Sequence, residues 1–230
     1  MGKRTNRFLT SLGAVAALSA LFAAAALAAT IIGTDAPEHL TGTNRDDQIQ
    51  ALGGNDVVDA RRGRDTVDGG AGDDRLLGGR GSDTQSGGDG NDQVSGYRGA
   101  DTQNGDAGDD RMSGGRGNDT QNGGPGNDRI FANLGRDTTF GGDGNDDLWA
   151  LARGDVHRRH DFSGDTLRGE GGDDTFHLRD GEGDVVSCGD GNDTALLDHK
   201  DRIEDASTAN PSGSCETVVR RAARRRHARR

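Results

Sequence analysis

The chain has 230 residues, of which 40 are glycine, and only 30% of its residues are hydrophobic and 3% aromatic. This composition cannot bury enough apolar surface to offset the conformational entropy of an ordinary globular domain, so order must come from periodic stacking, bound metal ions or both. The formal net charge is −11, and all 39 acidic residues lie between two basic ends. Such an acidic body disfavours nucleic acid as a partner and favours cations.

The first residues of the chain resemble a secretory signal. Lys3, Arg4 and Arg7 precede an apolar run over residues 8–27, and the tripeptide ALA that ends at Ala28 matches the small-x-small cleavage rule. We therefore expect a signal peptide over residues 1–28, a secreted protein, and no stable membrane span after cleavage. An uncleaved membrane anchor is the alternative, because about 20 apolar residues can cross a bilayer.

A nine-residue repeat follows a lead-in over residues 29–41. Thirteen blocks run without a gap from residue 42, and each has aspartate as its sixth residue. Skipping Arg159 and Leu178 restores the frame and adds further blocks. We expect a main array over residues 42–149 and a shorter one over 164–198. The sixth-position aspartates are Asp47, Asp56, Asp65, Asp74, Asp83, Asp92, Asp101, Asp110, Asp119, Asp128, Asp137, Asp146, Asp155, Asp165, Asp174, Asp184 and Asp193.

The eighth position of the blocks reveals a second period of eighteen residues. Alternate blocks carry apolar residues there, in the order Val58, Leu76, Val94, Met112, Ile130 and Leu148. The intervening blocks drift to polar residues, in the order Ile49, Val67, Gln85, Gln103, Gln121, Thr139 and His157. A coil with two strands per turn produces this alternation, because alternate blocks then lie in opposite parallel sheets, and residues eighteen apart stack at about 4.8 Å. We expect a three-residue strand at the end of each block, with position 8 facing inward.

The blocks also fit a known pattern, GGxGxDxUx, in which U is a large apolar residue. Residues 69–77 (GGAGDDRLL) and 141–149 (GGDGNDDLW) fit it at every position. The array therefore resembles the RTX (haemolysin-type) calcium-binding nonapeptide repeats. The resemblance implies an all-β fold, namely a right-handed parallel β-roll (a solenoid) with two nonapeptide repeats per turn and several Ca²⁺ ions in its turns.

Glycine and aspartate suit calcium binding for separate reasons. Glycine reaches positive φ and so allows a sharp turn that directs backbone carbonyls to one point, while the sixth residue supplies one of the roughly six to eight oxygens that Ca²⁺ takes. Residues 69–149 should hold the best ions, whereas Arg45 and the glycine-poor blocks at 51 and 60 predict a weaker N-terminal end. The predicted ligands are Asp56, Asp65, Asp74, Asp83, Asp92, Asp101, Asp110, Asp119, Asp128, Asp137, Asp146, Asp174 and Asp193.

Two sets of polar residues should lie on one sheet. Gln85, Gln103 and Gln121 should line its inner wall, either as a ladder of bonded amides or as a loose, hydrated wall, and the sequence leaves both open. Its outer face should carry a threonine row, while arginines lie on the other sheet; these residues are Thr66, Thr84, Thr102, Thr120 and Thr138, and Arg75, Arg111 and Arg129. A regular threonine row could bind ice or a polymer, but threonine also suits any exposed strand.

The repeat pattern breaks over residues 150–163, where Arg153 and Ser163 replace the turn glycine. We expect an irregular loop or bulge there. His157 and His160 lie in this segment and could bind a transition metal, although a histidine pair in a basic loop more often binds none.

The end of the chain has a narrower resemblance, to small exported bacterial calcium-binding proteins with a C-terminal cysteine pair. The stretch DVVSCGDGNDTALLD (residues 184–198) and the later CETVV carry it. It implies a Cys188–Cys215 disulfide and a disulfide-closed cap over residues 199–219, which in the chain-entropy model adds roughly 3–4 kcal/mol. Two unrelated thiols are the alternative.

The last segment, residues 220–230 from Arg220 to Arg230, is arginine-rich. We expect a disordered, solvated tail, which could instead contact an anionic cell-surface polymer by charge. We expect an N-terminal signal and no catalytic domain ahead of the repeats, which departs from the many RTX proteins that carry a C-terminal export signal behind an enzyme or toxin.

The function expected from these patterns is that of a secreted calcium-binding protein that folds when it binds Ca²⁺ and acts as a structural or interaction module. No HExxH, GxSxG or phosphate-loop motif is present, so we expect no enzyme activity. The alternatives are a surface adhesin or ice-binding protein that uses the threonine row, or a remnant of a larger RTX enzyme or toxin.

Overall fold

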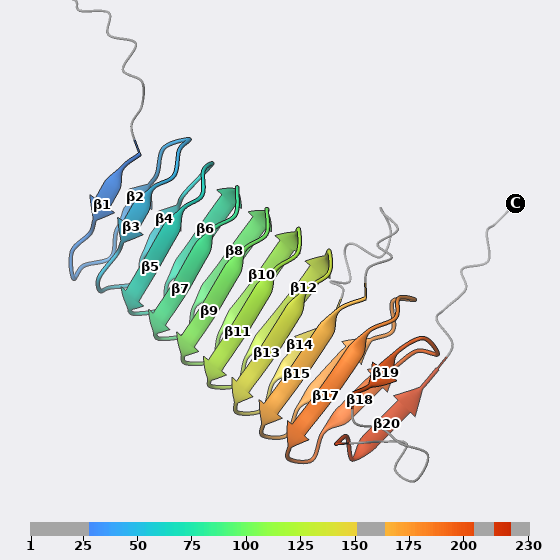
Figure 1. The fold of residues 1–230 in the computed structure, drawn as a ribbon. Coiled ribbons are helices and arrows are strands. Elements are labelled where there is room, and N and C mark those ends of the chain that lie inside the picture. Colours follow the sequence, from blue (N-terminus) through green and yellow to red (C-terminus); the bar gives the residue numbers. More distant parts are fainter. Residues whose placement is uncertain (1–27, 151–163, 205–213, 222–230) are drawn as a thin grey trace, which may run out of the picture.

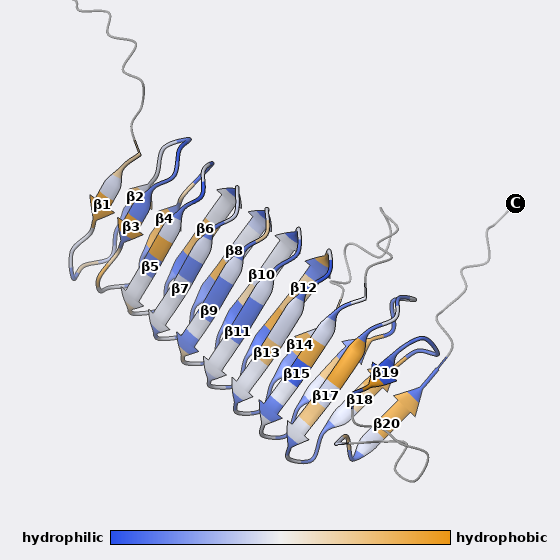
Figure 2. Cartoon of the chain, viewed as in Figure 1, coloured by the Kyte–Doolittle hydropathy of each residue, from blue (hydrophilic) through white to orange (hydrophobic). Residues whose placement is uncertain are grey.

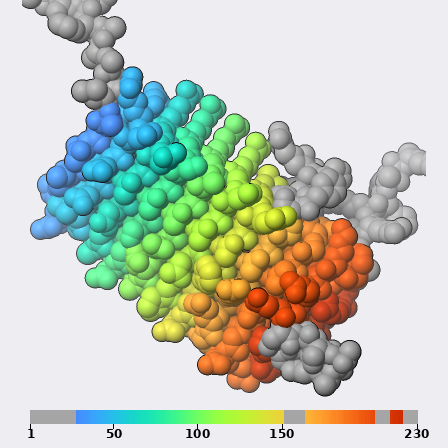
Figure 3. Space-filling view, viewed as in Figure 1, coloured from blue at the N-terminus to red at the C-terminus, as the bar shows by residue number. Residues whose placement is uncertain are grey.

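The computed structural model describes residues 28–150, 164–204 and 214–221. These residues form a parallel β-solenoid with two ten-stranded sheets, one built from the odd-numbered strands and one from the even-numbered strands (Figure 1). Each turn of the coil therefore adds one strand to each sheet, and the coils succeed one another along a slab-like body (Figure 3). The all-β solenoid with two repeats per turn is confirmed.

The odd sheet contains β1 (Thr30–Ile32), β3 (Gln48–Gln50), β5 (Thr66–Ala71), β7 (Thr84–Asp89), β9 (Thr102–Ala107), β11 (Thr120–Pro125), β13 (Thr138–Asp143), β15 (Thr166–Gly171), β17 (Val185–Asp190) and β19 (Arg202–Ile203). The even sheet contains β2 (His39–Thr41), β4 (Val57–Asp59), β6 (Arg75–Arg80), β8 (Gln93–Arg98), β10 (Arg111–Arg116), β12 (Arg129–Leu134), β14 (Asp147–Trp149), β16 (Thr175–Leu178), β18 (Thr194–Leu197) and β20 (Thr217–Arg220). No helix among the described residues has the length and hydropathy of a membrane span.

The strands of the central coils are longer than expected. A three-residue strand was predicted at the end of each block, but β7 also includes the first three residues of the following block. The reason lies in the two glycines that open that block. Gly87 faces the interior where a side chain would overlap the Asp92 carboxylate, and Gly88 takes φ +110°, so the backbone can continue its ladder into the turn.

The strand register confirms the eighteen-residue period but corrects one part of it. Across most of the roll, Cα partners are eighteen residues apart, as for Gln85 and Gln103. Thr139 pairs with Leu167, so the expectation that His157 follows it in the polar column is wrong. There the Asp137 N–H donates to the Asp165 carboxylate and the Asp146 N–H to the Asp174 carboxylate, so the aspartates that pair are 28 residues apart instead of eighteen. Asp155, His157 and His160 fall in residues 151–163, outside the described residues.

The interior is narrow: each sheet contributes a column of eighth-position side chains, and beside it lie mostly glycines and small residues such as Ala51 and Ala132. On the even side the column Val58, Leu76, Val94, Met112, Ile130 and Leu148 is fully buried, as the alternation predicts. On the odd side hydrophobic residues occupy the two ends, and β7, β9 and β11 show hydrophilic stretches between them (Figure 2). The threonine row Thr66, Thr84, Thr102, Thr120 and Thr138 pairs in direct register along the outside of the odd sheet.

The glutamines of the odd sheet form the amide ladder. Gln103 donates from Nε2 to Oε1 of Gln85, and Gln121 donates to Gln103, each at 3.0 Å. With amide oxygen and nitrogen exchanged, the ladder persists, and Gln103 also accepts from Gly96 N–H (2.9 Å) and donates to the Ser113 carbonyl (3.3 Å) in the opposite sheet. These bonds offset most of the cost of burying the amides, with Gln85 Nε2 left as a buried donor at one end of the ladder, and the structure therefore has the bonded ladder instead of the hydrated wall.

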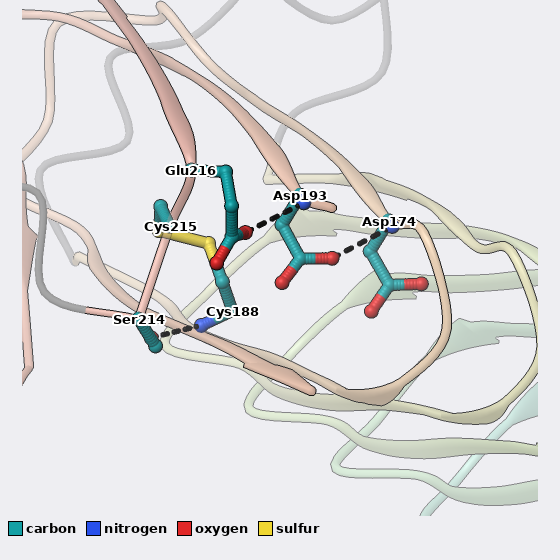
Figure 4. Close-up of a disulfide and its surroundings, with 6 residues drawn as sticks. All are labelled: Asp174, Cys188, Asp193, Ser214, Cys215 and Glu216. Carbon is teal, nitrogen blue, oxygen red and sulfur yellow. Dashed lines mark hydrogen bonds between the residues drawn. A yellow bond between two sulfur atoms is a disulfide. The ribbon is translucent and has the colours of Figure 1, made fainter. Parts of the chain in front are cut away.

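The C-terminal end is closed by the expected disulfide. Cys188 and Cys215 are bonded, with their Cα atoms 5.2 Å apart, and Ser214 Oγ accepts the Cys188 N–H at 3.0 Å (Figure 4). The segment expected to be a cap also adds strands β19 and β20, one to each sheet. The disulfide therefore fastens the last turn of the coil to the turns before it.

Candidate functional site

The turns lie along two edges of the roll. At the first edge, an odd-numbered strand turns into an even-numbered one (lower edge in Figure 1), and at the second edge an even-numbered strand turns into an odd-numbered one (upper edge in Figure 1). In most turns of the described roll the fourth residue of the block is a glycine with positive φ, such as Gly90 (+134°) at the first edge and Gly99 (+142°) at the second. A Cβ on either would overlap the carbonyl of the turn glycine one coil earlier, so this column of carbonyls points along the stack.

The sixth-position aspartates form a hydrogen-bonded column at each edge. Each carboxylate accepts through Oδ1 the backbone N–H of the aspartate one coil earlier, as Asp110 does from Asp92 (2.7 Å) and Asp119 from Asp101 (2.9 Å). The first-edge column comprises Asp56, Asp74, Asp92, Asp110, Asp128, Asp146, Asp174 and Asp193. The second-edge column comprises Asp47, Asp65, Asp83, Asp101, Asp119, Asp137, Asp165 and Asp184.

The second carboxylate oxygen of these residues points into the turn. Within the described residues, Oδ2 is buried without a hydrogen-bond donor in Asp56, Asp65, Asp74, Asp83, Asp92, Asp101, Asp110, Asp119, Asp128, Asp146, Asp174, Asp184, Asp193 and Asp198. Asp137 is buried in the same column, with Oδ1 accepting the Asp119 N–H. An orphaned buried acceptor costs about 1–3 kcal/mol, and more when it is charged. Rows of such oxygens call for cations or protons.

The surroundings of Oδ2 fit a cation with oxygen ligands. Gly114 lies against Asp119, because a Cβ there would come within 2.5 Å of Oδ2 and 2.9 Å of the Ala132 carbonyl oxygen on the next coil. No group of three or more His, Cys, Asp or Glu side chains within the described residues could hold a metal. Each turn thus offers one carboxylate among backbone carbonyls, and an ion there would take most of its ligands from the main chain, which suits a hard cation such as Ca²⁺.

Asp47 provides an internal contrast at the N-terminal end. Its Oδ2 accepts the Thr43 N–H at 2.6 Å, and the Thr43 hydroxyl donates to the same carboxylate. Burial raises its pKa, but the N–H groups of Ala29 and Thr43 outweigh that effect and lower it overall. The protein itself satisfies this carboxylate, so the first second-edge turn needs no ion.

Burial raises the pKa of Asp101 and Asp110, which lie in the middle of the two columns. Desolvation, together with the charge of neighbouring carboxylates, raises the pKa of Asp101 to about 6 and the pKa of Asp110 to about 7. Asp110 faces Asp92, Asp106 and Asp109, whereas Asp101 faces the charge of Asp119 alone.

The raised pKa values predict how the metal-free chain responds to pH. A carboxyl whose pKa is higher in the folded state than its ordinary value of about 4 stabilises the fold when protonated, and this stability is lost as pH rises through the folded-state pKa of about 6–7. We expect dialysed, metal-free protein to show strand circular dichroism at pH 4 and to lose it by pH 7.5. Equal strand signal at both pH values would contradict the prediction.

Several column members were not among the ligands predicted from the sequence. Asp165 and Asp184 continue the second edge, and burial raises the pKa of Asp184 to about 8. At the ends glutamate takes the place of aspartate: Glu38 Oε2 accepts the Thr34 N–H at 2.7 Å, and Glu216 Oε2 accepts the Asp193 N–H at 2.8 Å (Figure 4). Gly33, nine residues before Gly42 and packed against Glu38, is the sequence signal that marks this additional first block.

The comparisons with known proteins agree with this geometry. The model of the RTX calcium-binding nonapeptide repeat, which has four copies, matches residues 32–67, 56–85, 86–121, 122–151 and 163–185. No curated protein matches the chain.

Proposed function

Because the chain belongs to the RTX calcium-binding nonapeptide repeat family, we propose that it is a secreted, non-enzymatic protein that folds by binding several Ca²⁺ ions along both edges of its roll. The observation that carries the proposal is the double row of buried Asp Oδ2 atoms that no protein donor reaches. Ca²⁺ would supply two positive charges per site to carboxylates that otherwise repel one another.

The residues that would hold these ions are the column aspartates together with the carbonyls of the glycine turns. Carboxylate and carbonyl oxygens lie in the turns at both edges, and neighbouring coils place them one above another along each edge. Because a metal-free column stacks like charges at about 4.8 Å, binding and folding would form one transition. Sites of the extracellular type bind with dissociation constants of about 10⁻⁴–10⁻³ M, so the chain would stay loose inside a cell and fold after export.

The proposed location rests on two features. A disulfide between Cys188 and Cys215 persists in oxidising compartments and is rare in the cytosol. The N-terminal residues also have the composition of a secretory signal. The buried position of the column carboxylates supports the non-enzymatic role, because their Oδ2 atoms face the interior of the turns and are not exposed to a substrate.

Calorimetric titration of the chain without its signal, with circular dichroism alongside, tests the proposal. We expect uptake of several Ca²⁺ ions, in the millimolar range or tighter, together with a gain of strand signal. Asp110→Asn should lower the number of bound ions, because it removes the charge and replaces Oδ2 while a side-chain oxygen can still take the Asp92 N–H.

The matched control is Asp89→Asn, which removes the same charge from an exposed position at the same edge. It should bind as many ions as the unaltered chain. Failure to take up calcium at millimolar concentration, or equal loss in the two variants, would overturn the proposal.

A further inference from the structure

The two edges of the roll carry opposite charge outside the aspartate columns. At the first edge, exposed acids occupy the third and fifth positions of the blocks, namely Asp73, Asp89, Asp109, Asp143, Asp173 and Asp190. At the second edge, the third position of four successive blocks is arginine, namely Arg62, Arg80, Arg98 and Arg116. All four arginines are exposed. The second edge therefore presents a basic line on an otherwise acidic protein.

These four arginines stack directly on one another. Arg62 pairs with Arg80, Arg80 with Arg98, and Arg98 with Arg116, so one guanidinium projects from each coil at intervals of about 4.8 Å. Like charges in directly opposed positions destabilise a sheet. No ion pair within the described residues involves any of the four. Their positive charge is thus available to an anionic ligand that runs along the roll.

The surface beside the arginines is hollowed rather than flat. Tyr97 is flanked in register by Gly79 and Gly115, and the residue is 52% exposed. One hollow of about 500 Å³ lies over Gly79 and is lined by Tyr97, Arg80 and Arg98; Asp59 is the one carboxylate in its lining. A second of about 350 Å³ lies over Gly115, between Tyr97 and Arg116, with Ser95 and Ser113 as hydroxyl groups.

Tyr97 places an aromatic ring on the second edge of the roll. Tyr97 adopts φ +72°, a conformation that disfavours every residue with a Cβ, and glycine occupies the same block position in the coils on either side. Side chains occur at this block position in other coils with the same positive φ, as at Arg61 and Asn133, and at Tyr97 the side chain is an exposed aromatic ring. Its exposed ring offers a flat face between two arginine-rimmed hollows, which suits a sugar ring.

We propose that the second edge, from Arg62 to Arg116, binds an acidic polysaccharide. Guanidinium groups pair bidentately with the carboxylate or sulfate groups of such a chain, the hydroxyl groups of Ser95 and Ser113 can bond to its hydroxyls, and Tyr97 packs on a sugar ring. Single-stranded nucleic acid fits less well, because it needs an aromatic platform for successive bases and Tyr97 is the one aromatic lining these hollows. Duplex DNA would meet the acidic body.

The test measures binding of dextran sulfate and of hyaluronan oligosaccharides, which supply sulfate and carboxylate groups respectively, to calcium-loaded protein at low ionic strength. The Arg80→Gln/Arg98→Gln variant should bind roughly tenfold more weakly. Its control, Arg75→Gln/Arg202→Gln, removes the same charge from exposed positions away from the hollows and should bind normally. Tyr97→Gly should weaken binding by about threefold yet raise the melting temperature, because glycine relieves the backbone strain.

Circular dichroism recorded before the glycan is added separates this proposal from the calcium proposal, because failure to fold in calcium is visible at that stage. If glycan binding weakens equally in the two double variants, the effect depends on net charge alone, and the second edge is not the binding site. Tighter binding of single-stranded DNA than of both glycans would make the edge a nucleic-acid surface instead. Absence of glycan binding by folded protein would also end the proposal.

Discussion

Removal of calcium at pH 7.5 is expected to unfold the whole roll. About a dozen buried carboxylate oxygens would each cost about 1–3 kcal/mol without a partner, and their sum exceeds the roughly 5–15 kcal/mol by which folded domains are stable. The interior offers little compensation, since it is narrow, is lined largely by glycine and alanine beside the eighth-position columns, and includes three glutamines. Far-ultraviolet circular dichroism with excess chelator should lose its strand signal, and limited proteolysis should cut throughout the chain.

Two controls sharpen this experiment. Restoring calcium should recover the signal, whereas equimolar magnesium should not, because Mg²⁺ demands octahedral geometry and keeps its waters, while these turns offer carbonyls in a fixed arrangement. The Cys188–Cys215 disulfide stays closed under chelation, so the unfolded state remains linked at one end. A compact, protease-resistant rod in chelator would contradict the claim that cations hold the coil together.

The sequence predicts the coil well because its two constraints are local and periodic. The alternation of Val94 and Met112 with Gln85 and Gln103 places successive blocks in opposite sheets, since each strand buries its eighth-position residue and the next coil repeats it eighteen residues later. The aspartate columns follow from the same period. The type of residue at the eighth position therefore indicates which of the two sheets a block belongs to.

The predictions fail where a long-range contact decides between local alternatives. Nothing local distinguishes His157 from Leu167 as the successor of Thr139; the choice depends on which block stacks on β13. The pattern of sixth-position aspartates does not predict Glu38 and Glu216, because these two residues are glutamates. Their place at the ends of the columns follows from the N–H groups of Thr34 and Asp193, whose hydrogen bonds they accept. The strand length was underestimated because a pair of glycines normally signals the end of a strand, whereas here Gly87 makes room for Asp92 inside one.

The difference between the two edges also emerges only in three dimensions. In the sequence, Arg80 and Arg98 are separated by an aspartate-rich block and read as part of a mixed-charge repeat. The two-strand turn places every second block at the same edge, so acids and arginines that alternate along the chain separate in space. A period of eighteen therefore sorts charge as well as apolar residues.

Substitution of a turn glycine is the second change with a large expected effect. Gly99 has φ +142°, and a Cβ there would overlap the Gly81 carbonyl of the coil before it. Gly99→Val should therefore destabilise the roll by about 3 kcal/mol or more, since the unfavourable φ alone costs about 1–2 kcal/mol and the carbonyl column must also shift. Ala100→Val, at the exposed neighbouring residue, is the matched control and should cost little.

The effect of Gly99→Val should also be local in a characteristic way. Each coil of a solenoid contacts only its neighbours, so breaking one interface uncouples the stack into two parts instead of weakening it evenly. We expect the calcium titration followed by circular dichroism to become biphasic, and limited proteolysis at intermediate calcium to cut first near residue 99. A single transition at the same calcium concentration as Ala100→Val would contradict this prediction. It would show that the turn carbonyls are not packed closely enough to require glycine, and that they do not hold a fixed arrangement around the calcium ions.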